Sequence, residues 1–244
     1  MNLKHFFLAL SFLTRIPAPN LGQLEPPDFA RAALFYPAVG AIIGVILCIP
    51  LLLFPHAPPL LLAAILTVIW AMVTGGLHLD GLADSADAWL GGFGDSAKTQ
   101  RILKDPLVGA AGVIALVGVL LLKFAALVAV LENAAWWLIL IAPVIGRILI
   151  LLLFLTTPYV RAEGLASAVT AYLPRTADIW IVAGGLLLGF AVSGSGLIAV
   201  LLGFWLLWRL MLQRLQGCTG DTAGATVEIG EMLWLVGCCV SGSY

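Results

Sequence analysis

The chain has 244 residues and a formal net charge of −1; 62% of its residues are hydrophobic and 10% are charged. A soluble globular domain carries about 25% charged residues, so this composition excludes that class. The near-zero charge also excludes a basic nucleic-acid-binding surface. Several stretches of about 17 to 25 residues carry few charges, which is the length that a bilayer requires of a helix. We therefore predict an all-α, polytopic helical membrane protein with about seven transmembrane helices, built as a single integral membrane domain over residues 1–244.

The N-terminal segment, residues 1–30, is expected to lie on the membrane instead of crossing it. Its apolar part, 6–13, is short, follows Lys4 and precedes Arg15. This pattern predicts an interfacial helix with Arg15 in the headgroup layer. A cleaved signal peptide is the alternative, although no small-x-small cleavage site follows the apolar part.

Seven apolar stretches follow, separated by turns or by polar loops. In chain order they are 32–54, 60–79, 107–131, 135–156, 179–192, 197–212 and 226–240. The fifth and sixth are short and glycine-rich, so a re-entrant arrangement of that pair is an alternative. The long polar segments are 80–106, 157–178 and 213–225.

Basic residues mark one side of the predicted bundle. The connections at 55–59, 132–134 and 193–196 contain no lysine or arginine, whereas the N-terminal segment and the long polar loops contain most of them. The positive-inside rule then places the N-terminus and these loops in the cytoplasm. Because the candidate chemical residues lie in or near the same loops, we expect an active site at the cytoplasmic face.

The strongest chemical motif covers residues 75–87, GGLHLDGLADSAD, directly after the second apolar stretch. Its two leading glycines indicate a helix that breaks where the membrane ends. If the motif is helical, Asp80, Asp84 and Asp87 lie within roughly 60° of one another on one face. Three such carboxylates repel one another unless a cation lies between them, and Mg²⁺ prefers oxygen ligands. We predict a Mg²⁺ site; the alternative is a first helical turn in which aspartate favours the helix dipole.

A second motif closes the first polar loop. Lys104 and Asp105 stand before Pro106, and Arg101 lies three residues before Lys104. Asp105 is interpreted either as a helix N-cap or, with Lys104, as part of a phosphate-handling pair.

A third motif is the glycine-rich segment 217–225, which contains Gly220 and Asp221 and leads into the last apolar stretch. Such a backbone can approach an anion closely. Asp221 is interpreted as a metal ligand, a base or a capping residue. Glu228 and Glu231, at the start of the following helix, either complete a polar wall of the site or favour the helix dipole.

Two basic residues lie inside apolar stretches, where an unpartnered charge costs several kcal/mol. Arg147 is near the middle of its stretch and is expected to face the bundle interior with a carboxylate or a ligand phosphate as its partner. Lys123 is nearer the end of its stretch, and we expect it to extend toward the outer interface.

These motifs resemble the cobalamin synthase (adenosylcobinamide-GDP ribazoletransferase) family, in order along nearly the whole chain. The resemblance rests on Leu13-Thr14-Arg15-Ile16-Pro17, Tyr36-Pro37 with Gly40, Gly75 through Asp87, Lys104-Asp105-Pro106, Ala142-Pro143-Val144 with Gly146-Arg147, and Gly220-Asp221-Thr222 with Gly224-Ala225. One local departure is Gln216-Gly217, where the family's pattern has a pair of glycines, which leaves the conformation of this loop open.

The resemblance implies a Mg²⁺-dependent transferase of the bacterial cytoplasmic (inner) membrane that acts at the end of cobalamin biosynthesis. It implies that the enzyme joins adenosylcobinamide-GDP to α-ribazole, or to α-ribazole 5′-phosphate, and releases GMP. The expected partners are these substrates, the lipid bilayer and other enzymes of the pathway, with no nucleic acid. The residues expected to hold Mg²⁺ against the diphosphate are Asp80, Asp84, Asp87 and Asp221. Asp105 or Asp221 is expected to accept the proton of the attacking hydroxyl, and the residues expected to bind substrate are Arg101, Lys104, Arg147, Gly220 and Glu228.

Two other classes share some of these features. CDP-alcohol phosphotransferases also combine an Asp-Gly start with further aspartates around a metal, but their pattern has an arginine where this chain has Asp84. A small transporter usually carries polar residues near the membrane midplane and broken helices in two matching halves, and neither feature is visible in this sequence.

Overall fold

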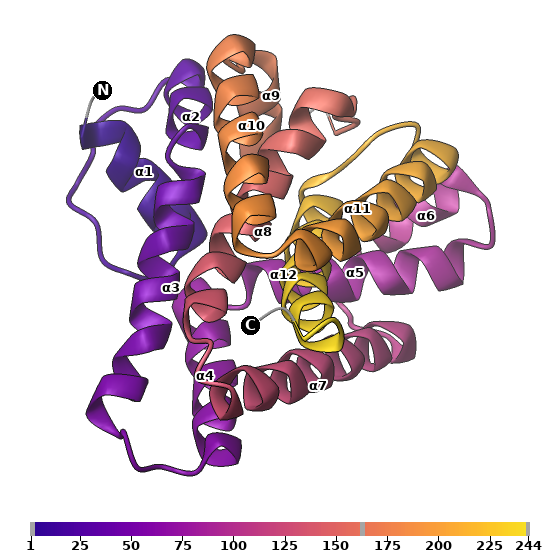
Figure 1. Ribbon diagram of the computed structural model, residues 1–244. Helices are drawn as coiled ribbons and strands as arrows, with labels where there is room; N and C mark the ends of the chain where they lie inside the picture. Colours follow the sequence, from indigo (N-terminus) through magenta and orange to yellow (C-terminus); the bar gives the residue numbers. More distant parts are fainter. Residues whose placement is uncertain (1–2, 162–163, 243–244) are drawn as a thin grey trace.

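The computed structural model describes residues 3–161 and 164–242. Within those ranges the chain is helical, apart from its connections and an isolated parallel bridge between Tyr159 and Cys218. The predicted all-α class is confirmed (Figure 1). In chain order the helices are α1 (Leu3–Leu13), α2 (Pro26–Ala33), α3 (Tyr36–Leu53), α4 (Pro59–Thr74), α5 (Leu77–Gly92), α6 (Ser96–Ile102), α7 (Ala110–Glu132), α8 (Trp137–Thr156), α9 (Leu165–Ala171), α10 (Arg175–Val192), α11 (Gly194–Leu215) and α12 (Gly220–Val240).

The number of candidate membrane spans agrees with the prediction of about seven. In the described ranges, α3, α7, α8, α10, α11 and α12 are each long and apolar enough to cross a bilayer, and the bent pair of α4 and α5 adds a seventh candidate. The pair predicted to be weakest, α10 and α11, has 18 and 22 residues. The largest difference is at α12, which starts at Gly220 instead of residue 226, so the glycine-rich segment forms its first helical turns.

The chain turns sharply between α4 and α5, at the predicted break. Gly75 and Gly76 have φ angles of +64° and +73°, a left-handed conformation that glycine adopts without strain. The two helix axes differ in direction by 90°, so α5 leaves the line of α4 and carries the acidic motif away from that apolar helix. Arg15 closes this corner, because its backbone N–H donates to the carbonyl of Val73 at 2.8 Å and its side chain lies against Gly75.

Helices α8 and α12 form the centre of the molecule. α8 packs against α3, α10 and α12, and α12 also contacts α5, α7 and α11 (Figure 1). A Cβ atom on Gly40 of α3 would lie 2.6 Å from the carbonyl oxygen of Pro143 of α8. Small residues at such a contact let membrane helices approach closely. Trp234 of α12 is fully buried and donates its indole N–H to the carbonyl of Leu138 of α8 at 3.1 Å.

The N-terminal helix is joined to this core. Leu8 and Leu13 of α1 are buried among its apolar residues. Lys4 and His5 bond the carboxylate of Asp28 in α2 at 2.8 and 3.0 Å. The Lys4 ammonium, a backbone N–H and His5 hold the pKa of Asp28 well below its usual range. The predicted segment 1–30 therefore contains a packed helix, with residues 1 and 2 outside the described ranges.

Candidate active site

The candidate site lies where α5 crosses the first turns of α12. A Cβ atom on Gly81 would lie 2.6 Å from the carbonyl oxygen of Asp221, and one on Gly224 would lie 3.2 Å from the Cα of His78. The two backbones therefore touch, which is possible only where the side chain is a hydrogen atom. This contact explains the glycine after Asp80 in the acidic motif, and it brings the acidic face of α5 to Asp221.

Four carboxylates meet at this crossing, and we call them the acidic cluster: Asp80, Asp84, Asp87 and Asp221. The motif is helical from Leu77 to Gly92, so the predicted common face of the three α5 aspartates is present. Asp80 is exposed, whereas the other three are partly buried. Burial, together with the negative charges of Asp80, Asp221 and Asp87, raises the pKa of Asp84 to about 6. The cluster thus holds more negative charge than its surroundings neutralise.

The donor atoms of the acidic cluster suit Mg²⁺ that arrives with a phosphate. Among the described residues, no three His, Cys, Asp or Glu side chains converge closely enough to hold a metal ion by themselves. Mg²⁺ is commonly bound through one or two carboxylates, while substrate phosphates and water complete its coordination. Repelling carboxylates beside an open face are ligands of this kind, so the residues fit such a cation.

Asp87 has a contact that the motif did not predict. Its carboxylate accepts hydrogen bonds from the backbone N–H groups of Gly109 at 2.7 Å and Gly112 at 2.9 Å. These groups lie at the start of α7, where the first N–H groups of a helix have no partner within the helix. Asp87 therefore caps α7 from a neighbouring helix, and its part in binding Mg²⁺ stays a prediction.

Arg161 supplies the basic partner of Asp221, and the sequence did not single it out. Its guanidinium nitrogen Nη2 lies 2.5 Å from Oδ2 of Asp221 and donates to the carbonyl of Leu103 at 3.0 Å. Two backbone hydrogen bonds of 3.0 and 2.8 Å join the segment 158–160 to Cys218, and they hold Arg161 beside the start of α12. In the sequence, the feature that could have pointed to Arg161 is that it is a basic residue in a polar loop.

The loop with the unusual glutamine keeps a glycine-like conformation. Gln216 ends α11 with a φ angle of +58°, and Gly217 lies directly against the backbone of Pro158. A residue with a Cβ atom pays about 1–2 kcal/mol for this left-handed conformation. The surrounding contacts therefore hold the loop in place despite the departure from the family's pattern.

Asp105 does not cap a helix, so that interpretation is wrong. Its Oδ1 accepts a hydrogen bond from the backbone N–H of Leu107 at 3.1 Å, which closes a local turn. α7 begins only at Ala110, with Gly109 as its N-cap residue. Asp105 is exposed, so its carboxylate is accessible to a ligand.

Lys104 lies at the edge of the acidic cluster, and Arg101 is three residues before it, in α6. The guanidinium of Arg161 contacts both the carbonyl of Leu103 and the carboxylate of Asp221, so residue 104 lies beside the cluster. Both Arg101 and Lys104 are exposed. Their predicted contact with substrate phosphates is compatible with this position and stays a prediction.

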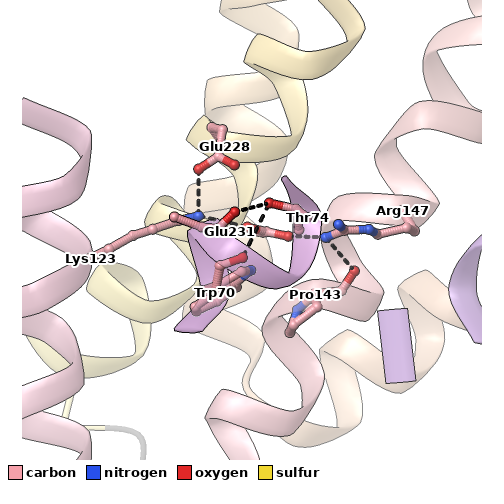
Figure 2. Close-up of polar contacts among 8 residues, drawn as sticks. Trp70, Thr74, Lys123, Pro143, Arg147, Glu228 and Glu231 are labelled. Atoms are coloured by element: carbon pink, nitrogen blue, oxygen red, sulfur yellow. Dashed lines mark hydrogen bonds and ion pairs between the residues drawn. The ribbon is translucent and has the colours of Figure 1, made fainter. Parts of the chain in front are cut away.

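A second group of charges lies deeper, and we call it the buried ion-pair network (Figure 2). Lys123 of α7 places its Nζ 2.6 Å from carboxylate oxygens of Glu228 and Glu231 of α12. Arg147 of α8 pairs with the other oxygen of Glu231. Lys123 also lies 4.3 Å from the ring centre of Trp70 in α4. The network joins α7 and α8 to α12, and Glu228 is seven residues, or about 10 Å along the helix, from Asp221.

The contacts of this network show that the prediction for Lys123 is wrong, and they confirm the prediction for Arg147. Lys123 does not extend to an interface, because it is only 3% exposed and its charge is balanced by carboxylates of α12. A lysine within a membrane span is stable when it has such partners. Arg147 faces the interior as predicted, with Glu231 as its carboxylate partner. Arg147 and Glu228 are buried in this network, and their contact with substrate stays a prediction.

A cavity of about 160 Å³ lies directly against the acidic cluster and contains Asp80, Gly220 and Asp221 in its lining. Its other walls come from α1, α3, α8 and α9. The exposed Gly220 begins α12, so a helix N-terminus also borders this space. The site therefore combines carboxylates, a helix N-terminus and an adjoining apolar cavity.

The chain is similar to known transferases over almost its whole length. Residues 5–239 match the family described as cobalamin-5-phosphate synthase. The chain is 48% identical over 236 residues to the adenosylcobinamide-GDP ribazoletransferase of Pseudomonas putida (strain W619), which covers 95% of this chain and 97% of the relative. The protein of the same name from Acinetobacter baumannii (strain ACICU) is 46% identical over 243 residues, with 98% of each chain covered. No solved structure shows significant similarity to the chain.

These similarities confirm the family predicted from the motifs, the enzyme class, which is a transferase, and the assignment to cobalamin biosynthesis. The apolar helices are those of a multi-pass membrane protein, and the relatives are bacterial. The match includes both the α5 motif and the start of α12, which together form the acidic cluster. The chain therefore belongs to the cobalamin-5-phosphate synthase family.

Proposed function

We propose that the chain is a Mg²⁺-dependent adenosylcobinamide-GDP ribazoletransferase, which joins adenosylcobinamide-GDP to α-ribazole or α-ribazole 5′-phosphate and releases GMP. The observation that carries this proposal is the excess of carboxylates at the crossing of α5 and α12. There, Arg161 is the basic side chain that forms an ion pair with the acidic cluster, at Asp221. A dianionic diphosphate can approach such a surface only together with a cation.

Asp84 and Asp80, with Asp221 beside them, are the residues that would hold Mg²⁺. When it is bound, Mg²⁺ neutralises the diphosphate and the charge that develops on the departing GMP. Asp87 would contribute through the carboxylate that also caps α7. Asp84 is the strongest candidate, because its pKa is raised by burial and by the other three carboxylates.

The basic residues at the edge of the cluster would position the phosphates. Lys104 and Arg101 are exposed and free to turn toward a diphosphate, and arginine matches phosphate oxygens with two parallel N–H groups. The backbone N–H of Gly220 at the start of α12 would add a further donor to an anion. Together these groups bind the substrate without touching the reacting hydroxyl.

Asp221 is the proposed proton acceptor. The hydroxyl oxygen of the acceptor ribose forms a bond to the phosphorus attached to cobinamide, the bridging P–O bond of the diphosphate breaks, and GMP leaves with the bonding electrons. The proton of the hydroxyl passes to the carboxylate of Asp221, which Arg161 holds in place at 2.5 Å. Asp105, exposed in its turn, is the second candidate for this role.

We place the site at the cytoplasmic face of the bacterial inner membrane, with the N-terminus on the same side and the whole chain as one catalytic domain. The distribution of lysine and arginine supports this orientation. The residues of the acidic cluster and the exposed Arg101 and Lys104 then face the compartment that contains the soluble substrates.

The test is GMP release by purified protein in liposomes with Mg²⁺. We expect Asp84→Asn, Asp80→Asn and Asp221→Asn to lower the rate roughly 100-fold or more, since each removes a group that acts on the transition state. Asp95→Asn is the matched control, because Asp95 is exposed and caps α6. Wild-type rates in the Asp84→Asn protein would show that the metal assignment is wrong.

A further inference from the structure

The cavity at the acidic cluster has one polar side, which we call its mouth, and a mostly apolar lining elsewhere. Asp80, Gly220 and Asp221 form one side. The rest of the lining is mostly apolar and includes three rings, with the residues Phe12, Leu13, Tyr36, Ile150, Phe154 and Val169. Its polar member is His78, whose buried Nε2 has no hydrogen-bond partner among the described residues. Within the described part of the chain, no lysine or arginine lines this space. A phosphate group would therefore find no lysine or arginine partner in this cavity.

Several rings line or support the cavity. Phe12 of α1 stacks on Tyr36 of α3 with ring centres 6.3 Å apart and planes 27° from parallel. Phe154 of α8 is held by an edge contact with Tyr159 at a centre distance of 6.3 Å. Phe154 and Tyr36 are 5% and 3% exposed, so their rings are fixed by packing. Such fixed rings favour a flat, apolar ligand, because aromatic faces stack on one another.

We propose that this cavity binds the heterocyclic base of the acceptor nucleoside and thereby determines which base the enzyme accepts. This inference rests on the proposed transferase function. A base in the cavity places the ribose attached to it at the mouth, beside Asp221. The hydroxyl that attacks phosphorus then lies next to the proposed proton acceptor, so one binding event orients the reacting group.

The other parts of the substrates fit this space less well. Guanine carries several hydrogen-bond donors and acceptors, and each one that is buried without a partner costs about 1–3 kcal/mol. The corrin ring with its side chains is far larger than a cavity of about 160 Å³. The base of α-ribazole is a dimethylbenzimidazole, which is flat, uncharged and mostly apolar, so it loses little on leaving water and gains contact with the rings.

Part of the cavity lining comes from two short helices that lie far apart in the sequence. α1 provides Phe12 and Leu13, and α9 provides Ala166 and Val169. The N-terminal segment is therefore part of the proposed acceptor site. Ala166 is a small, partly buried residue of the lining, so a larger side chain there would occupy the space of the base.

The experiment measures KM separately for adenosylcobinamide-GDP and for two acceptors, α-ribazole and the corresponding nucleoside of unmethylated benzimidazole. We expect Phe154→Leu to raise KM for α-ribazole about tenfold, because a stacking ring contributes about this much to the binding of a base. KM for adenosylcobinamide-GDP should stay within twofold. Ala166→Phe should raise KM for α-ribazole by at least as much, and by more than for the unmethylated benzimidazole nucleoside, because it narrows the cavity.

Phe190→Leu is the control, since Phe190 of α10 is 63% exposed and lies outside the cavity lining. The melting temperature of each variant shows whether it is folded, and Ala166→Phe decides if Phe154→Leu does not fold. An unchanged KM for α-ribazole in Ala166→Phe would overturn the proposal, as would a rise confined to adenosylcobinamide-GDP. Absence of GMP release by the wild-type protein with every acceptor would instead contradict the proposed function.

Discussion

The acidic cluster and the buried ion-pair network share the helix α12, on which Asp221 of the cluster and Glu228 of the network are about 10 Å apart. Their charges are arranged in opposite ways. The network pairs two basic side chains with two carboxylates, all at most 4% exposed. The acidic cluster has four carboxylates, and among the described residues one of them forms an ion pair, with a partly exposed arginine. A charge within a membrane protein is stable when it has a partner in the protein, whereas an excess at an open face can be neutralised from outside.

This difference separates two kinds of acidic residue on α12. Glu228 and Glu231 fix α12 against α7 and α8, and Asp221 remains available at the open end. The network therefore fixes the position of α12, whose first turn contributes Asp221 to the site. Substitutions that remove one charge of the network should lower stability. Substitutions that remove a charge of the acidic cluster should weaken ligand binding.

The largest effect is expected when the network loses its balance. Glu231→Ala leaves Arg147 buried without its carboxylate partner, and breaking a buried pair in this way costs about 3–5 kcal/mol. We expect the melting temperature in detergent to fall by about 10 °C, measured by thermal unfolding and size-exclusion chromatography. The double variant Lys123→Met/Glu228→Leu removes one charge of each sign and should stay within about 1 kcal/mol of wild type. Equal stability of the two variants would contradict the stabilising role of the balanced network.

A smaller effect is expected at the ion pair between Arg161 and Asp221 of the acidic cluster. Arg161→Ala removes the guanidinium that holds Asp221, and a hydrogen bond to a charged group contributes about 1.5–3 kcal/mol. We expect kcat/KM for GMP release to fall about 10- to 100-fold, with a melting temperature close to that of wild type. Arg161→Lys keeps the charge and should recover part of the rate. No loss of activity in Arg161→Ala would show that Asp221 needs no partner to act.

Variants of Asp87 test whether one carboxylate can both cap α7 and bind Mg²⁺. Asp87→Ala removes the cap of α7 and should lower the free energy of unfolding by about 1 kcal/mol. Asp87→Asn keeps an oxygen acceptor and should cost less. If Asp87 only caps α7, the activity of folded Asp87→Asn stays within a few-fold of wild type. A loss similar to that of Asp84→Asn would show that its carboxylate also binds Mg²⁺.

The smallest effect concerns pH. Burial and neighbouring carboxylates raise the pKa of Asp84 to about 6, above the value of about 3.9 in an unfolded chain. The folded protein then binds this proton more tightly, so the contribution of Asp84 to stability decreases as pH rises from about 4 to 6. Without divalent cations, we expect the wild type to lose about 2 °C in melting temperature over this interval relative to Asp84→Asn, since solvent screens part of the repulsion. If the melting temperatures of the two proteins changed equally with pH, the proposed repulsion between Asp84 and the neighbouring carboxylates would be contradicted.

Much of the architecture follows from local sequence patterns. Apolar length identifies the membrane helices, Gly75 and Gly76 indicate the break, and the spacing of Asp80, Asp84 and Asp87 gives their common face. These features depend on helix geometry alone. The start of α12 was misjudged because glycine-rich segments usually form loops, whereas Thr219 and Thr222 form a reciprocal cap that starts the helix at Gly220.

The partners of the charged residues could not be predicted, because they depend on how distant helices pack. Lys123 is stabilised by carboxylates more than 100 residues later in the chain. Arg161 reaches Asp221 from another loop, and nothing in its own neighbourhood distinguishes it from Arg175. The cavity likewise combines residues of α1, α8 and α9, which no local pattern connects.

The central claim is that the acidic cluster, and not the network, binds the cation. Mn²⁺ can replace Mg²⁺ as a paramagnetic probe, and its binding in the presence of GMP can be followed by the loss of the free-ion signal in electron paramagnetic resonance. The wild type and the Asp95→Asn control should bind Mn²⁺ with the same affinity, and Asp84→Asn should bind it about tenfold or more weakly. Equal Mn²⁺ affinity in wild type and Asp84→Asn would contradict the claim.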